Sequence, residues 1–198
     1  MAGVVLVDEQ RVEKPSHQFD SNSAIRIKGG DDPTSRYVGR GGMKLEAALR
    51  EFQIDVAGLT CLDVGASTGG FTDCLLQNGA KKVYAIDVGH GQLAWKIRND
   101  PRVIVREKLN ARFLTRADVP EPIDLCVIDV SFISLTLILP NALQLLTPDG
   151  VMLPLIKPQF EVGREEVGRG GIVRSAELHE KAQEKIATFA ENIGARVG

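Results

Sequence analysis

From residue 44 onward, short apolar runs alternate with longer segments in which apolar residues recur at helical spacing. The runs are almost continuously apolar, as expected for strands that are buried on both faces of a sheet. Alternation of such strands with helices is typical of a parallel sheet covered by helices on both sides. We therefore predict an α/β, doubly wound, Rossmann-like domain over residues 44–198. The expected strands are 60–64, 82–87, 103–106, 124–129 and 150–156, and the expected helices are 44–52, 70–78, 91–98, 133–146 and 175–193.

The first 30 residues have a different pattern. They contain β-type runs at 4–7 and 24–28, separated by a turn-like break. Because so few short strands do not fold alone, we interpret residues 1–30 as part of a small β-rich module. Residues 31–43 have the composition of a linker. A strand directly after Met1, and the opening of another strand after residue 194, indicate a chain that is clipped at both ends.

Composition narrows the possible functions. The formal net charge of the 198 residues is -2, so affinity for nucleic acid must come from a local patch. Cys61, Cys74 and Cys126 lie in apolar runs without metal or redox spacing, which predicts reduced core residues in a cytoplasmic protein. The sequence has no signal peptide and no apolar stretch of about 18 residues, so we expect no membrane association. The scattered histidines predict no metal site.

A glycine-rich turn follows the first strand of the predicted domain, and Asp63 and Asp87 end the first two strands. A strand, such a turn and a helix form a concave site that backbone N–H groups line. Asp87 is placed to accept hydrogen bonds from ribose hydroxyls. The residues predicted to bind a cofactor are Asp63, Gly65, Ser67, Gly69, Gly70, Phe71, Thr72, Asp87, Val88, Asn110 and Asp129.

Three interpretations of this turn compete. A glycine turn without a ligand is one, and a dinucleotide site is another. The dinucleotide pattern G-x-G-x-x-G is broken at Gly65-Ala66-Ser67. The carboxylate of Asp63 would also repel phosphates, whereas it suits a ligand with an amine or a sulfonium. The third interpretation, an S-adenosylmethionine site, is therefore favoured.

Polar residues end the fourth and fifth predicted strands, at Asp129 and Lys157. The carboxyl ends of strands in a doubly wound sheet face the ligand crevice, so both side chains should lie near the cofactor. A lysine after six mostly apolar residues is poorly explained by a solvated surface. Beside Asp129 it is either a structural ion pair or a lysine that takes part in proton transfer. Lys44 either joins them from the preceding helix or is an exposed helical lysine.

Several segments, in this order, carry a family resemblance. They are 39–45 (GRGGMKL), 62–72 (LDVGASTGGFT), 128–134 (IDVSFIS), 156–161 (IKPQFE) and 168–174 (GRGGIVR). Together they resemble the TlyA/hemolysin A family of ribosomal RNA 2'-O-methyltransferases over essentially the whole chain. That family couples an S4-like RNA-binding domain to an FtsJ-like methyltransferase domain. Residues 1–30 resemble only the second half of the S4-like domain.

The resemblance implies a Lys-Asp-Lys-Glu set for 2'-O-methylation, whose first three members match Lys44, Asp129 and Lys157. In the family the glutamate follows one further strand, which this chain does not reach; Glu161 and Glu165 do not occupy its position. The resemblance also implies S-adenosylmethionine as cofactor and ribosomal RNA or a ribosomal subunit as partner. Lys157 is expected to position or deprotonate the ribose hydroxyl, with Asp129 orienting Lys157.

Contacts with RNA are expected from the segment 25–44, which has five basic residues against two acidic ones. The residues predicted to bind RNA are Arg26, Lys28, Arg36 and Arg40. Such contacts would make binding salt-dependent, although a solvated linker fits the same charges. Two rival functions remain: a non-catalytic RNA-binding or ribosome-assembly protein, and a membrane-active hemolysin. The second is disfavoured by the lack of an apolar span or a strongly basic amphipathic helix.

Overall fold

The computed structural model describes residues 5–8, 10–12, 16–27 and 36–198, and the chain divides into two compact units, Met1–Tyr37 and Val38–Gly198. In the first unit, the strands are β1 (Val5–Val7), β2 (Gln10–Arg11) and β3 (Ile25–Ile27). They form an antiparallel sheet in the order β2-β1-β3. The sequence predicted β1 and β3 but not β2, because two residues are too few to show a periodic pattern.

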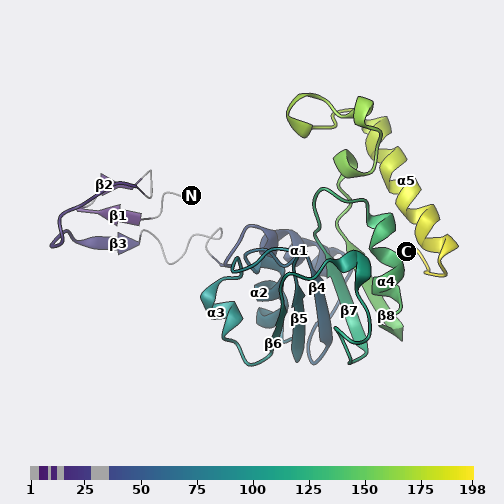
Figure 1. Ribbon diagram of the computed structural model, residues 1–198, viewed down its shortest axis with the longest axis horizontal. Coiled ribbons are helices and arrows are strands. Elements are labelled where there is room, and N and C mark those ends of the chain that lie inside the picture. The colour runs from purple at the N-terminus through teal and green to yellow at the C-terminus, as the bar shows by residue number, and fades with distance from the viewer. Residues whose placement is uncertain (1–4, 9, 13–15, 28–35) are drawn as a thin grey trace. The chain divides into compact units, whose positions relative to one another are not determined.

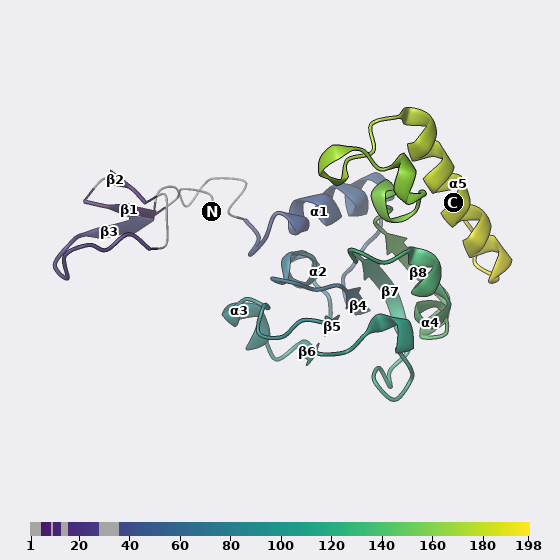
Figure 2. The ribbon, with the colours of Figure 1, turned by 45° about the horizontal axis from the view of Figure 1, so that its top comes forward.

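The second unit is built on a parallel sheet (Figures 1 and 2). Its strands are β4 (Thr60–Val64), β5 (Lys82–Ile86), β6 (Val103–Arg106), β7 (Ile123–Ile128) and β8 (Leu146–Pro154). Their order is β6-β5-β4-β7-β8, and every neighbouring pair is parallel. The predicted α/β class is therefore confirmed. The chain first builds outward from β4 to β6 and then returns to the other side of β4, so the topological switch point lies between β4 and β7.

Helices lie on both faces of this sheet. They are α1 (Gly41–Glu51), α2 (Gly70–Gln77), α3 (Trp95–Arg98), α4 (Leu139–Leu143) and α5 (Ala176–Asn192). Helix α1 packs on α2, and α2 packs on β4 and β5 (Figure 2). Helix α2 is buried along most of its length, because it lies between α1 and the sheet. In the part of the chain that the structure describes, no helix is both long and apolar enough to span a membrane.

Three predicted helices differ from the observed ones. The helix expected at 91–98 begins only at Trp95, since Gly91 has a left-handed φ of 70° that an α-helix does not accept. The helix expected at 133–146 is divided into the 3₁₀ turn Leu135–Leu137 and α4, with Pro140 in the first turn of α4. Proline lacks an N–H group, so it starts a helix more readily than it continues one. Helix α1 begins at Gly41, inside the expected linker.

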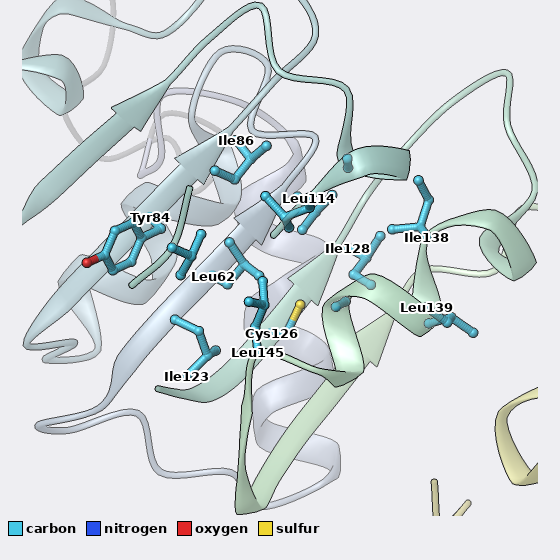
Figure 3. Close-up of a cluster of buried hydrophobic side chains, with 14 of the residues drawn as sticks. Leu62, Tyr84, Ile86, Leu114, Ile123, Cys126, Ile128, Ile138, Leu139 and Leu145 are labelled. Atoms are coloured by element: carbon cyan, nitrogen blue, oxygen red, sulfur yellow. The ribbon is translucent and has the colours of Figure 1, made fainter. Parts of the chain in front are cut away.

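The core follows the strand alternation. Residues two apart on β4, β5 and β7 point to one face, where they pack against Leu139 of α4 (Figure 3). Ile186 of α5 belongs to the same cluster. The cluster includes Leu62, Tyr84, Ile86, Cys126, Ile128, Leu139, Leu145 and Ile186. All three cysteines are free and buried, as the sequence predicted. Burial raises the pKa of the Cys61 thiol to about 12, so that thiol stays protonated and inert.

The ends of β4 and β7 meet at a glycine. Gly65 follows β4 with a φ of 90°, and a Cβ atom there would lie 2.7 Å from the backbone oxygen of Asp129. The amide of Asp129 in turn donates to the backbone oxygen of Val64 at 2.9 Å. The first residue beyond each strand is therefore held against its neighbour at the switch point. A side chain at position 65 would push these two segments apart.

We expect Gly65→Ala to destabilise the protein much more than Gly58→Ala. Both glycines have positive φ, so both variants carry backbone strain of about 1–2 kcal/mol. A Cβ at Gly58 meets nothing within 4 Å, whereas at Gly65 it meets a backbone carbonyl. The additional loss for Gly65→Ala should be about 1–3 kcal/mol, measured by thermal unfolding. Equal losses for the two variants would show that the close approach to Asp129 is unimportant.

Candidate functional site

The glycine turn after β4 is fastened to the neighbouring strand. The amides of Gly65 and Ala66 both donate to the backbone oxygen of Ile86, at 2.9 and 3.0 Å. Ser67 has a φ of 49°, and its amide donates to Oδ2 of Asp87 at 2.7 Å. The turn is therefore a fixed cradle of backbone groups at the carboxyl ends of β4 and β5. Such a cradle can receive a ligand that approaches the backbone closely.

Gly70, at the start of α2, is a second position where the backbone of another segment approaches closely. A Cβ on Gly70 would lie 3.0 Å from the amide nitrogen of Gly42 and 3.1 Å from the backbone oxygen of Gly39. The segment that leads into α1 thus runs directly over the beginning of α2. The side chain of Phe71 is buried, and a Cβ on Gly41 would lie 3.3 Å from its ring. Gly39 and Gly41 are therefore closely packed against the beginning of α2, which a flexible linker would not be.

Asp63 is fully buried beneath this cradle. Its Oδ2 accepts a hydrogen bond from Oγ1 of Thr72 at 2.6 Å, whereas its Oδ1 is buried without a hydrogen-bond partner among the described residues. Burial raises the pKa of Asp63 to about 7. The hydrogen bonds with Thr72 lower it in part, and the nearby carboxylates of Asp129 and Asp87 add smaller upward contributions. This oxygen is therefore an acceptor that a ligand with a hydrogen-bond donor or a positive charge would satisfy.

Asp87 binds the loop that follows β5. Its Oδ1 accepts from the amide of Gly89 at 2.6 Å, in addition to the Ser67 contact of its Oδ2. A carboxylate has about four acceptor positions, so two remain for ligand hydroxyls. Val88, the next residue, is 72% exposed. Asn110 is exposed, and its Oδ1 caps the 3₁₀ turn Ala111–Phe113 by accepting from the Arg112 amide.

Asp129 and Lys157 lie in contact at the ends of β7 and β8. Nζ of Lys157 is 2.5 Å from Oδ1 of Asp129, and both side chains are four-fifths buried. The angle of this contact is not that of a hydrogen bond, so we describe the pair as an ion pair. The same Nζ donates to Oγ of Ser131 at 2.9 Å. The structure thus brings together two of the three residues predicted to be catalytic.

Lys44 does not join them. It is exposed in the first turn of α1 and makes no hydrogen bond or ion pair with any residue that the structure describes. Its helix nevertheless starts against Gly70 of the cradle. Of the two interpretations of Lys44, the exposed helical lysine is the one that agrees with its contacts in this structure.

Phe132 was missed by the sequence analysis. Its side chain is 92% exposed, its φ is 65°, and its ring packs at a tilt against Phe160 with 5.2 Å between centroids. A bulky residue in the left-handed region is strained and persists only where its surroundings enforce it. Phe132 directly follows Ser131, so an aromatic surface borders the Lys157–Asp129 pair. In the sequence, the one indication that Phe132 is functional was its position in the segment 128–134, which carries the family resemblance.

The remaining predicted residues are less constrained. Arg40 is exposed just before α1, and the guanidinium of Arg36 lies 5.2 Å from the centre of the Tyr37 ring. Lys28 and the side chain of Arg26 lie outside the described residues. Glu161, excluded from the family position, is buried and bonded to other parts of the fold. Within the described ranges no group of three or more His, Cys, Asp or Glu residues is arranged to hold a metal ion.

Comparison with known proteins identifies relatives over nearly the whole chain. A candidate rRNA methyltransferase of Bacillus subtilis, YqxC, is 49% identical over 191 residues, which cover 96% of this chain and 67% of the relative. The 16S/23S rRNA (cytidine-2'-O)-methyltransferase TlyA of Mycobacterium tuberculosis is 46% identical over 193 residues, or 98% of this chain and 71% of that protein.

Solved structures agree with this relationship. A candidate hemolysin from Lactococcus lactis superimposes with a TM-score of 0.78 at 55% identity, covering 81% of this chain and 77% of that one. The fold is shared with Aeropyrum pernix fibrillarin, solved with bound S-adenosyl-L-methionine (TM-score 0.54, 18% identity, 78% of this chain and 66% of that one). The sequence profile of the FtsJ-like methyltransferases matches residues 37–196. The chain belongs to the FtsJ-like methyltransferase family, among close relatives that carry the names TlyA and hemolysin A.

Proposed function

We propose that this protein transfers a methyl group from S-adenosylmethionine to the 2'-hydroxyl of a ribose in ribosomal RNA. The observation that carries the proposal is the Lys157–Asp129 pair, which lies at the ends of adjacent strands beside the glycine cradle. The names of the relatives that modify rRNA support the same substrate. An rRNA substrate also implies a cytoplasmic site of action.

The residues around the cradle fit S-adenosylmethionine. The amide groups of the turn and the free acceptor positions of Asp87 suit its ribose and its amino acid portion. The partnerless oxygen of Asp63 suits a cationic neighbour, and no phosphate has to be accommodated. When bound, this cofactor supplies an activated methyl group on a sulfonium. Asp63, Asp87 and the backbone of residues 65–70 would hold it.

Lys157 is suited to hold the acceptor hydroxyl. Its ammonium has three N–H groups; one donates to Ser131, and Asp129 provides a counter-charge. At least one N–H therefore remains to donate to a substrate oxygen. Asp129 and Ser131 fix the direction of the lysine, so that the hydroxyl is aligned before it reacts. Alignment of this kind can contribute about 7–11 kcal/mol to catalysis in well-oriented systems.

A proton must also leave the hydroxyl as it is methylated. An ammonium cannot accept this proton, so Lys157 acts as the base only if it first releases one proton to solvent. The neutral amine then takes up the hydroxyl proton, and Asp129 stabilises the ammonium that forms again. Lys44 belongs to this proposal as a side chain on the adjacent helix that contacts RNA when RNA is bound. The exposed ring of Phe132 offers a surface on which a base next to the reacting ribose can stack.

Further RNA contacts are assigned to Arg36, at the end of the N-terminal unit, and to Arg40, at the start of the methyltransferase unit. Arg26 and Lys28 extend this set in the N-terminal unit. We assign residues 1–30 to part of an S4-like RNA-binding domain. The methyltransferase unit begins at Val38, earlier than the predicted boundary at residue 44, because α1 starts inside the predicted connection 31–43. Phosphate contacts by such residues would weaken steeply with salt.

Methyl transfer with labelled S-adenosylmethionine tests the proposal. Ribosomal subunits or rRNA from cells that lack the enzyme are incubated with the protein, and the RNA is then hydrolysed with alkali. A 2'-O-methyl group blocks alkaline cleavage at its own nucleotide, so the label should be recovered in alkali-resistant dinucleotides. Label recovered in single nucleotides would indicate methylation of a base and would contradict the proposal.

Lys157→Met should reduce methyl transfer by about 10²–10⁴-fold, the usual contribution of a positioned acid–base group. The affinity for S-adenosylmethionine should stay within about twofold, because the cradle and Asp87 lie on other strands. Lys82→Met is the matched control, since it removes another lysine ion pair, with Glu121, from the opposite end of the sheet. Comparable activity in the two variants would refute the role of Lys157.

The affinity for S-adenosylmethionine should increase with pH, because burial raises the pKa of Asp63 to about 7. Below that pH the empty site holds a neutral carboxyl, and a cationic ligand must expel its proton. Between pH 6 and pH 8 the affinity should rise about tenfold in calorimetric titrations. In Asp63→Asn the affinity should no longer increase with pH in this way. Any pH dependence that remains in the variant is caused by titration of the cofactor's own amine. Identical pH profiles would exclude Asp63 from the site.

Phe132→Ala should lower kcat/KM for RNA about tenfold, since base–aromatic stacking contributes about 1–3 kcal/mol. Binding of S-adenosylmethionine should not change. Phe52→Ala is the control, because Phe52 is also an exposed phenylalanine (62%) but lies at the far end of α1. A decrease of the same size in both variants would mean that Phe132 has no special place in RNA binding.

A further inference from the structure

One buried carboxylate near the site has no part in the chemistry described above. The side chain of Glu161 is only 1% exposed. Its Oε2 accepts a hydrogen bond from Oγ of Ser134 at 2.6 Å, and its Oε1 accepts from the amide of Leu135 at 2.8 Å. A buried carboxylate is costly unless it is paired and hydrogen-bonded. Glu161 is therefore fixed in place, and it fixes its partners.

These contacts belong to a series that joins two segments, 131–135 and 157–161. Lys157 donates to Ser131, Phe160 packs on Phe132, and Glu161 binds Ser134 and Leu135. The contacts follow one another in the same order along both segments. The Lys157–Asp129 pair lies at one end of the series and Glu161 at the other. The exposed Phe132 lies between them.

The middle of this series is strained. Phe132 has a φ of 65°, a conformation that a bulky side chain adopts only where neighbouring contacts enforce it. Ser134 and Leu135 begin the 3₁₀ turn that follows, and Ser134 also caps that turn. Glu161 therefore holds the first residues of the turn that follows Phe132. Glu161 supplies the only carboxylate hydrogen bonds to this turn among the described contacts.

Glu161 is also joined to α5. Nζ of Lys185 lies 2.7 Å from the backbone oxygen of Glu161 and 3.1 Å from its Oε2. The lysine gives the buried carboxylate a counter-charge and fixes the distance between α5 and the segment 157–161. Glu161 thus links the turn that follows Phe132 to α5.

We infer that Glu161 is a positioning residue for the RNA substrate, which sets the orientation of Phe132 and of the segment 131–135 beside Lys157. This inference rests on the proposed function and deepens it. Glu161 acts through Phe132 and touches neither the cofactor cradle nor the Lys157 ammonium. Its loss should therefore impair the reaction with RNA and leave the binding of S-adenosylmethionine intact.

Glu161→Gln tests this inference, with Glu166→Gln as the matched control. Glu166 lies in the same loop, accepts a backbone hydrogen bond from Gly163 and pairs with Lys181 of α5, but it has no contact with 131–135. Glu161→Gln should lower kcat/KM for RNA about tenfold, and Glu166→Gln less than twofold. Both should bind S-adenosylmethionine as the wild type does. If kcat/KM for RNA decreased equally in the two variants, Glu161 would only stabilise the loop, and the inference would be wrong.

A double-mutant cycle separates positioning from stability. If Glu161 acts through Phe132, Glu161→Gln should have little further effect in a Phe132→Ala background. Full additivity of the two changes would overturn the inference. Ser134→Ala removes one of the two hydrogen bonds to Glu161. It should reproduce part of the Glu161→Gln effect when Phe132 is present, and it should have little effect together with Phe132→Ala.

A readout without RNA keeps this test separate from the proposed function. The protein has seven phenylalanines, and 4-fluorophenylalanine labelling gives each a fluorine resonance, with that of Phe132 identified by Phe132→Leu. In Glu161→Gln the Phe132 resonance should move, and in Glu166→Gln it should not. An unmoved resonance would contradict the inference even if methylation is observed. A moved resonance in a protein that does not methylate rRNA would support it while the proposed function fails.

Discussion

The site depends on the close approach of two strand ends at the switch point of the sheet. Because Gly65 has no Cβ, the backbone after β4 can lie against the carbonyl of Asp129 after β7. That approach places the cofactor cradle and the Lys157–Asp129 pair next to each other. A larger residue at position 65 would push the glycine cradle away from the Lys157–Asp129 pair.

The three carboxylates near the switch point favour the binding of a cation. Asp63, Asp87 and Asp129 end three adjacent strands, and their mutual repulsion adds to the burial that raises the pKa of Asp63 to about 7. Asp87 is stabilised by backbone amides and Asp129 by Lys157. Among these three aspartates as the structure describes them, Asp63 has an oxygen with neither a hydrogen bond nor an ion pair. A positively charged cofactor would complete this set, which explains how a carboxylate can be tolerated beneath the cradle.

The sequence predicted most of the sheet and the contact between Asp129 and Lys157, because strand ends in a doubly wound sheet converge whatever the loops do. It did not predict the left-handed conformation of Phe132, which is enforced by Phe160 and by Glu161, residues nearly 30 positions away. Nor could the periodic pattern of 133–146 show where Pro140 would begin a new helix. The roles of Lys44 and of the RNA-binding arginines depend on a substrate, so neither the pattern nor the fold determines them.

The most direct measurement is calorimetric titration of the protein with S-adenosylmethionine, repeated with Asp87→Ala. This aspartate both holds Ser67 of the cradle and keeps acceptor positions free for a ligand. The account predicts one binding site per chain in the wild type and an affinity that falls at least tenfold in the variant. Binding that Asp87→Ala leaves unchanged, or no binding by the folded wild-type chain, would contradict the assignment of the cradle as the cofactor site.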